Sequence, residues 1–180
     1  MERIYFGNGN THGNYTGASL TGADLTGATL SGANLSSANL SSATLSVADL
    51  TYANLTNANL NYTNLSGASL TGTNLYGADL INANLNYTNL SGAHLSSAYL
   101  YGTNLSYATL TNANLNDANL TGASLINAKL NDANLNYAIL TGANLNGADL
   151  TGTMINGVIV TKAQLANLGA LNTDTIIGIN

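Results

Sequence analysis

Few side chains of this sequence are of a type that performs acid–base or metal chemistry. The 180 residues include two histidines, His12 and His94, and no cysteine. Histidine is the usual general base and a common metal ligand near neutral pH, whereas a disulfide always needs two cysteines and structural zinc is often bound by cysteine. His94 occupies a position that is otherwise mostly Asn in the surrounding sequence. We therefore interpret His94 as an exposed substitute for Asn rather than as a catalytic base or ligand.

The acidic residues and glycines also lack the spacing of a reactive site. Gly7, Gly9 and Gly13 do not match a phosphate-binding fingerprint. No two carboxylates are placed as a general acid and base would be. The sequence predicts a protein that is not an enzyme, with no catalytic, cofactor-binding or metal site and no cofactor. The aspartates considered are Asp24, Asp49, Asp79, Asp117, Asp132 and Asp149.

The charge balance argues against binding to nucleic acid, and the short apolar runs argue against a membrane segment. Eight acidic and three basic residues give a net charge of −5, and only 6% of the residues are charged. A phosphate backbone requires clustered basic residues, and this chain has only Arg3, Lys129 and Lys162. The first residues lack the apolar stretch of a secretory signal, and no apolar run is long enough to span a bilayer. We expect a cytoplasmic protein.

A five-residue period organises the chain. Every fifth residue from Leu20 to Leu150 is leucine, which makes 27 consecutive positions. The residue two positions before each leucine is alanine in 23 cases. The position between them is mostly Asn, Asp, Ser or Thr. Threonine replaces the alanine at Thr63, Thr73, Thr88 and Thr103.

This period excludes a helix and a flat strand. A step of five residues rotates about 140° on a helix, so the leucines would not form one apolar stripe. On a flat strand an odd period sends successive leucines to opposite faces. The leucines share one side only if the chain bends once per repeat. We therefore expect a coil with Leu and Ala inside and stacked turns that pair their backbones.

The corner of each repeat, two residues after the leucine, is occupied by several residue types. From Gly22 to Gly157 it is Gly, Asn or Asp in 19 of 28 cases, the residues that best tolerate a positive φ. Tyrosine and Val47 also occupy it. Because these residues disfavour a positive φ, the sequence predicts more than one turn type.

The unit Ala-(Asn/Asp/Ser/Thr)-Leu followed by two variable residues resembles the pentapeptide-repeat family. An example is Ala23-Asp24-Leu25-Thr26-Gly27, and the match extends from about residue 16 to 160. The resemblance implies an all-β fold, a right-handed quadrilateral β-helix with 20 residues per coil and about seven coils. We then expect residues 20 apart to stack, including an Asn column with His94, a Tyr87–Tyr107 pair and an exposed Lys129–Asp149 ion pair. The buried Thr hydroxyls should each bond to a local backbone carbonyl.

The two ends break the repeat. We expect residues 1–15 to be an N-terminal cap segment, residues 16–160 the repeat domain, and residues 161–180 a C-terminal cap. Thr161 and Gln164 match a capping box, which predicts a short helix over about 162–168. The alternative is one more coil side, because Leu165 keeps the period. The apolar tail is expected to cover the end or to join two copies, as a homodimer or end-to-end oligomer, through Leu171, Ile176, Ile177 and Ile179.

Three functions fit these features. The first is a structural or protein-interaction solenoid that presents flat polar faces to an unknown protein partner or to its own copies. The second is a DNA-mimicking regulator of DNA gyrase, which the family resemblance suggests and which needs a strong negative field. The third is an ice-binding surface, because Thr51, Thr71, Ser91 and Thr111 form a hydroxyl column. The candidate partner contacts are the tyrosines of the middle coils, Tyr87, Tyr99, Tyr101 and Tyr107; the alternative is that they cover neighbouring coils.

Overall fold

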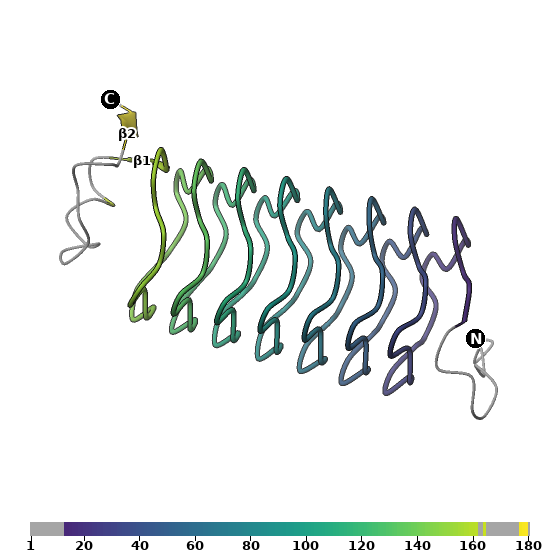
Figure 1. Ribbon diagram of the computed structural model, residues 1–180. Coiled ribbons are helices and arrows are strands. Elements are labelled where there is room, and N and C mark those ends of the chain that lie inside the picture. The colour runs from purple at the N-terminus through teal and green to yellow at the C-terminus, as the bar shows by residue number, and fades with distance from the viewer. Residues whose placement is uncertain (1–12, 162–163, 165–176, 180) are drawn as a thin grey trace.

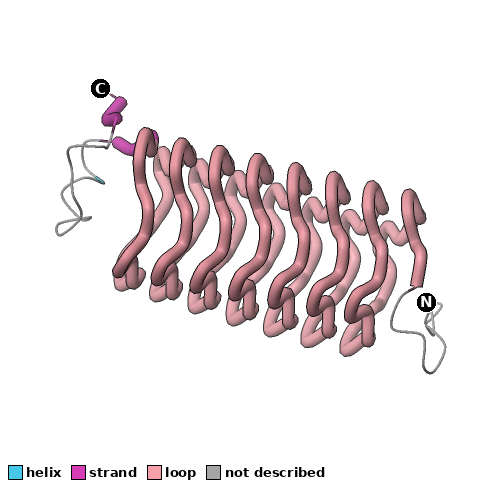
Figure 2. The backbone as a smooth tube through the Cα atoms, viewed as in Figure 1, coloured by secondary structure: helices cyan, strands magenta, loops and turns pink. Residues whose placement is uncertain are grey.

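The computed structural model describes residues 13–161, 164 and 177–179. There the chain forms a row of coils that stack side by side (Figures 1 and 2). Parallel bridges join residues 20 positions apart, from Asn14↔Asn34 to Ile139↔Ile159. Each coil therefore contains four five-residue units, the number that the family resemblance implies.

The coils are held together mainly by isolated bridges and not by long strands. The described residues include two strands, β1 (Ile159–Thr161) and β2 (Ile177–Ile179), which pair in parallel with Ile159 opposite Ile177. Elsewhere a turn begins two residues after each bridge, so no side is long enough to form a strand. Pairing begins at Asn14, two residues before the predicted start of the repeat. Tyr15 packs against the core.

Every backbone amide of a typical repeat has a partner. The Leu amide and the corner amide donate to carbonyls of the next coil, and the amide before the Leu donates to the previous coil. The Ala amide closes the turn onto the preceding Leu carbonyl. The remaining amide, directly after the Leu, donates to the Asn or Asp side chain before the Leu, as Thr56 N does to Asn54 Oδ1 at 3.1 Å. This bond gives a physical reason for Asn and Asp at that position.

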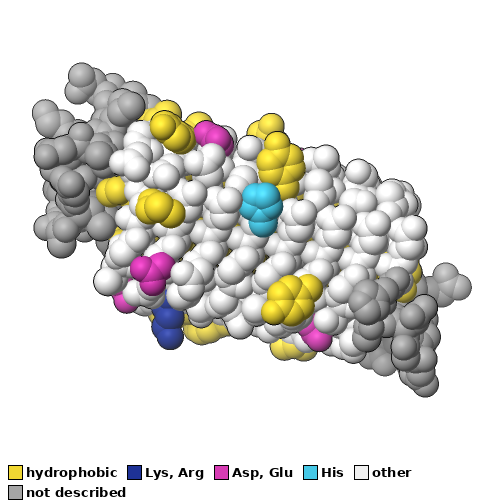
Figure 3. All heavy atoms as spheres, in the orientation of Figure 1, with side chains coloured by type: hydrophobic (Ala, Val, Ile, Leu, Met, Phe, Trp, Pro, Cys, Tyr) yellow, Lys and Arg dark blue, Asp and Glu magenta, His cyan; other side chains and the backbone are white. Residues whose placement is uncertain are grey.

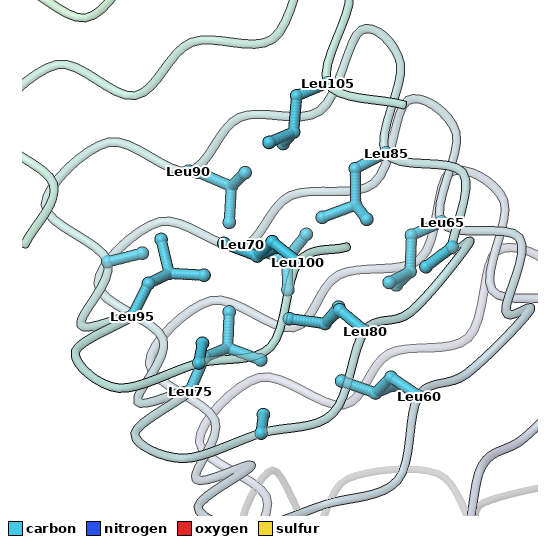
Figure 4. Close-up of a cluster of buried hydrophobic side chains, with 14 of the residues drawn as sticks. Leu60, Leu65, Leu70, Leu75, Leu80, Leu85, Leu90, Leu95, Leu100 and Leu105 are labelled. Atoms are coloured by element: carbon cyan, nitrogen blue, oxygen red, sulfur yellow. The ribbon is translucent and has the colours of Figure 1, made fainter. Parts of the chain in front are cut away.

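The leucines and alanines form one continuous core. Figure 4 shows Leu60 to Leu105 pointing into the coil from successive sides. Leu35 to Leu110 have no measurable exposure, and the alanines between them are at most 1% exposed. Burial of a leucine contributes about 1.5–3 kcal/mol, so this ladder is the main source of stability.

The four threonines at alanine positions are buried and hydrogen-bonded. Thr88 donates to Leu85 O at 2.6 Å, which is the local bond expected from the sequence. The other three instead donate to the Leu carbonyl of the previous coil, 23 residues earlier, as Thr73 does to Leu50 O at 2.8 Å. The expectation of a local carbonyl was therefore wrong for Thr63, Thr73 and Thr103.

The prediction of several turn types was wrong. Every corner residue from Gly17 to Gly157 has a positive φ, between 52° and 71°, including Val47 and five tyrosines. The residue before the corner has no positive φ, and the Leu carbonyl accepts from the amide three residues later. These features define a type II turn. Because neighbouring coils pair on both sides of each corner, they hold even Val47 in a conformation that costs an L-residue about 1–2 kcal/mol.

Glycine at a corner often leaves room for a side chain of the previous coil. The Tyr52 ring lies over Gly72, where an added Cβ would be 2.5 Å from it. Asn57 lies over Gly77 in the same way. Gly92 and Gly122, which follow another glycine 20 residues earlier, have nothing within 4 Å. The choice of glycine at positions such as Gly72 and Gly77 therefore reflects space as well as φ.

Candidate interaction surfaces

The four predicted contact tyrosines lie on two separate surfaces. Tyr87 and Tyr107 stack at one corner column, with ring centroids 5.0 Å apart and planes at 7°, as expected for residues 20 apart. Tyr99 lies on a flat side of the coil, and Tyr101 lies in the turn that ends this side. Tyr107 lies in the following turn along the chain. Tyr99 and Tyr101 are 55% and 51% exposed, so both are available to a partner.

Two further aromatic side chains, Tyr76 and His94, lie in the same two adjacent coils as Tyr99 and Tyr101. Tyr76 is 46% exposed, and its ring centroid lies 5.9 Å from that of the exposed His94. All four side chains come from two adjacent coils, and Figure 3 shows the histidine beside hydrophobic side chains on a mostly uncharged face. We call Tyr76, His94, Tyr99 and Tyr101 the aromatic patch.

An 18-residue step explains why Tyr76 meets His94. The residue directly after a Leu repeatedly contacts the residue 18 positions later in the sequence. That second residue lies in the next coil, directly before a Leu. Asn61 Nδ2 donates to Asp79 Oδ2 at 2.8 Å, and the Ser106 and Ser124 hydroxyls are 2.9 Å apart. The 20-residue repeat by itself does not indicate these diagonal neighbours.

The polar sides carry regular amide ladders. Asn54 donates to Asn34 at 3.3 Å, and Asn84 and Asn104 continue a second ladder from Asn64. The predicted Asn column with His94 is therefore confirmed at Asn34 and Asn54, and Asn64, Asn84 and Asn104 form a further one. The predicted hydroxyl column from Thr51 to Thr111 is only partly exposed.

The charged side chains are few and scattered. Asp49 and Asp149 share one column but lie five coils apart, and Asp24 and Asp79 belong to two other columns. Lys129 lies beside Asp149 in the adjacent coil, as predicted, and its charge attracts the carboxylate only weakly; within residues 13–161 the two make no direct salt bridge.

Hydrogen bonds, more than Lys129, set the ionisation of Asp149. The side-chain hydroxyl of Thr151 lowers the pKa of Asp149 most, followed by the side chain of Asn131 and the backbone amide of Thr151. Lys129 makes the smallest contribution to this lower pKa.

Gln164 closes one side of the C-terminal end. It is helical, and it forms the predicted capping box with Thr161: Thr161 N donates to Gln164 Oε1 at 2.8 Å, and Gln164 N donates to Thr161 Oγ1 at 3.4 Å. The same side chain accepts from Gly142 N at 3.2 Å and donates to Ala143 O at 2.8 Å and Leu140 O at 2.6 Å. The side-chain amide of Gln164 thus makes the hydrogen bonds that a backbone peptide group of a further coil would make.

The remaining predictions for this end lie largely outside the described residues. These are the rest of the helix over 162–168, the extra coil side at Leu165, and the tail residues Leu171 and Ile176. Of the proposed self-association residues, Ile177 and Ile179 lie in β2, where their backbone extends the stack by one more pairing.

The described residues bring no reactive groups together. They contain no group of three potential metal ligands, and no helix among them is long and apolar enough to cross a membrane. A hollow beside Gln164 is lined by Ala143, Leu145 and two asparagines, none of which titrates. The described surface offers contact area and hydrogen bonds, and the aromatic patch adds three half-exposed tyrosines to it.

A family model for pentapeptide repeats matches eight copies in this chain. The matches cover residues 16–51, 48–86, 78–117, 113–152 and 128–167. No curated protein sequence matches the chain.

Several solved structures are similar to the chain. Rfr23, a pentapeptide repeat protein from the cyanobacterium Cyanothece 51142, is 37% identical, with 58% of this chain covered and a TM-score of 0.35; the chain spans 62% of Rfr23. HetL from Nostoc sp. strain PCC 7120, a pentapeptide repeat protein involved in heterocyst differentiation regulation, is 33% identical over 82% of this chain and 85% of its own, with a TM-score of 0.31. QnrB1, a plasmid-mediated fluoroquinolone resistance protein, is 23% identical over 92% of this chain and 91% of its own, with a TM-score of 0.48.

Proposed function

This chain belongs to the pentapeptide-repeat family, and we propose that it is a non-catalytic scaffold that binds a protein partner through the side of its coils. The observation that supports this function most is the aromatic patch, in which three half-exposed tyrosines lie within two adjacent coils. Tyrosine is enriched at protein interfaces because it offers a large contact area at a small entropic cost. We further propose that the coil has the right-handed quadrilateral form of the family and that the protein acts in the cytoplasm.

The stiffness of the coils supports binding over catalysis. Bridges on every side hold each coil, and the interior is filled by leucine and alanine, which leaves no lumen for a substrate. A partner therefore meets a surface that is already ordered, and binding does not require the side chains beneath the patch to rearrange.

The DNA-mimic alternative receives less support from the described surface. Its aspartates belong to several different columns, and those that share a column lie five coils apart, as Asp49 and Asp149 do. A duplex-like negative field needs a continuous row of such charges. The ice-binding alternative likewise lacks a fully exposed hydroxyl column, because Thr51 and Thr71 are partly buried.

Affinity capture with matched variants tests the proposal. The bait is the full chain, either unchanged, with Tyr99→Ser and Tyr101→Ser, or with Tyr52→Ser and Tyr137→Ser as a control for loss of exposed tyrosine elsewhere. We expect one identified protein to be enriched by the unchanged chain and the control but lost from the patch variant. Equal recovery by all three baits, or recovery by none, would contradict binding through the patch.

Self-association is the second form of this proposal, through the C-terminal end that includes Ile177 and Ile179. It is favoured by the pairing of β2 with β1, which extends the stack to the tail. Light scattering of the full chain separates the forms: a dimer whose mass falls to a monomer on Ile177→Asp supports the end contact, whereas a monomer at all concentrations contradicts it.

A further inference from the structure

We propose that Asp79 and the neighbouring tyrosines of the aromatic patch bind an arginine side chain of the protein partner. This inference rests on the proposed function and adds the chemistry of the partner, a positively charged segment. It concerns the middle of the stack, where Asp79 and Tyr99 are direct neighbours in adjacent coils.

The carboxylate of Asp79 is held in a fixed position. Asn61 Nδ2 donates to Asp79 Oδ2 at 2.8 Å, while Asn61 Oδ1 accepts from Ile81 N at 2.8 Å. A weaker bond of 3.4 Å runs from Ile81 N to Asp79 Oδ1. A carboxylate has about four acceptor sites, so Asp79 keeps acceptor capacity for a ligand after these two bonds.

The surroundings of Asp79 differ from those of the other bridged aspartates. Asp79 pairs with Tyr99, which is 55% exposed. Asp24 and Asp49 pair with serine or threonine, and Asp149 pairs with Lys129. Among the bridge partners of these four aspartates, only that of Asp79 is an exposed aromatic residue.

An aromatic ring beside a carboxylate fits a guanidinium group. Arginine is planar, stacks on aromatic faces and donates two parallel hydrogen bonds to a carboxylate. Tyr99 offers the ring, and Tyr101, 51% exposed at the next corner, offers contact area for the rest of the partner segment. A lysine ammonium would use the charge of Asp79 but not the planar stacking.

The overall charge also favours a cationic partner. The chain carries a net charge of −5. The described residues hold six aspartates against one lysine, Lys129, which lies on a different side from the patch. A net negative surface speeds the approach of a positive segment and repels an acidic one, with an effect that salt weakens.

The test is a titration of the full chain with a labelled five-residue peptide that contains two arginines. The matched control peptide contains citrulline, which has the same shape without the charge. Asp79→Asn preserves the side-chain size, and Asn occurs at this column position at Asn59. Tyr99→Ser removes the ring. Asp49→Asn and Tyr107→Ser are the controls on other surfaces.

We expect the arginine peptide to bind, with at least fivefold weaker binding for Asp79→Asn, for Tyr99→Ser and for the citrulline peptide. The two control variants should bind within twofold of the unchanged chain, and added salt should weaken binding. Equal binding of both peptides, unchanged binding by Asp79→Asn, or binding of a neutral oligosaccharide in place of the peptide would overturn the inference. If affinity capture still finds a partner that needs Tyr99, the scaffold function stands while the arginine assignment falls.

Discussion

Two glycines of the same corner column, Gly72 and Gly92, separate the backbone cost of an added methyl group from its packing cost. Their φ angles are 63° and 65°, so a change to alanine carries the same backbone strain at both sites. That strain is about 1–2 kcal/mol. The reduced freedom of the unfolded chain offsets about 0.4–1 kcal/mol of it. Because nothing lies within 4 Å of a Cβ at Gly92, we expect Gly92→Ala to cost about 1 kcal/mol.

Gly72→Ala should cost more, because the new Cβ would meet the Tyr52 ring at 2.5 Å. Tyr52 is 71% exposed, so the ring can swing away from the corner. The ring would then expose to water the minor part of its surface that is now buried. That part is about 60 Å², worth about 1.5 kcal/mol at about 25 cal/mol per Å². We therefore expect a total cost of about 2–2.5 kcal/mol at Gly72.

Urea unfolding followed by circular dichroism measures both costs. The matched control is Tyr52→Ala, alone and combined with Gly72→Ala, since removal of the ring should lower the cost of Gly72→Ala to that of Gly92→Ala. Equal costs at Gly72 and Gly92 in the presence of Tyr52 would refute the argument that the previous coil determines where glycine is needed.

Three further predictions concern the core, the end and the surface. Leu85→Ala should lower the free energy of unfolding by about 2–5 kcal/mol in urea titrations, because Leu85 is fully buried; a cost below about 1 kcal/mol would contradict the packed interior. Gln164→Glu places a carboxylate against the carbonyls of Leu140 and Ala143, so we expect it to destabilise by about 1–3 kcal/mol at pH 7. Because the folded state raises the pKa of the introduced carboxyl, this loss should shrink as the pH falls towards about 4, and thermal melts that show no pH dependence relative to the unchanged chain would contradict the cap. The pKa of Asp149 lies below its ordinary value of 3.8, chiefly through the Thr151 hydroxyl, so its stabilising effect is present above that pH and is lost as the pH falls through the lower folded pKa. An NMR titration of Asp149 should show a higher pKa in Thr151→Val, and an unchanged pKa would show that the hydroxyl is not the cause.

The period of the coil was predictable because it follows from one requirement. Leucines five residues apart, such as Leu60 and Leu65, share a dry interior only if the chain turns between them. The leucine period therefore indicated the inner positions, whereas the stacking of Tyr87 on Tyr107 and the Asn ladders also required the 20 residues per coil that the family resemblance implies.

The corners were not predictable from single-residue preferences. Val47 and Tyr52 adopt a positive φ because the coils on either side fix the backbone, a tertiary effect that outweighs their local cost. The hydrogen bonds of Thr73 and Asn54 could likewise be assigned only once the pairing of all five amides was known.

The candidate site was only half visible in the sequence. Tyr99 and Tyr101 are close in sequence, but the contact of Tyr76 with His94 depends on a diagonal step between coils. The self-association residues were predicted from the apolar composition of the tail alone. Of these residues the structure describes only Ile177 and Ile179, which lie in β2.

The 20-residue step between paired residues is tested most directly by engineered disulfides, because the chain has no cysteine of its own. Asn39 and Asn59 form a bridge between adjacent coils, a spacing that suits a disulfide. Asn39 and Asn54, which are only 15 residues apart, lie on different sides of the coil. We expect the cysteine pair at 39 and 59 to oxidise readily in the folded protein and the pair at 39 and 54 to stay reduced. Oxidation of the 15-residue pair in preference to the 20-residue pair would contradict the stacked four-unit coil.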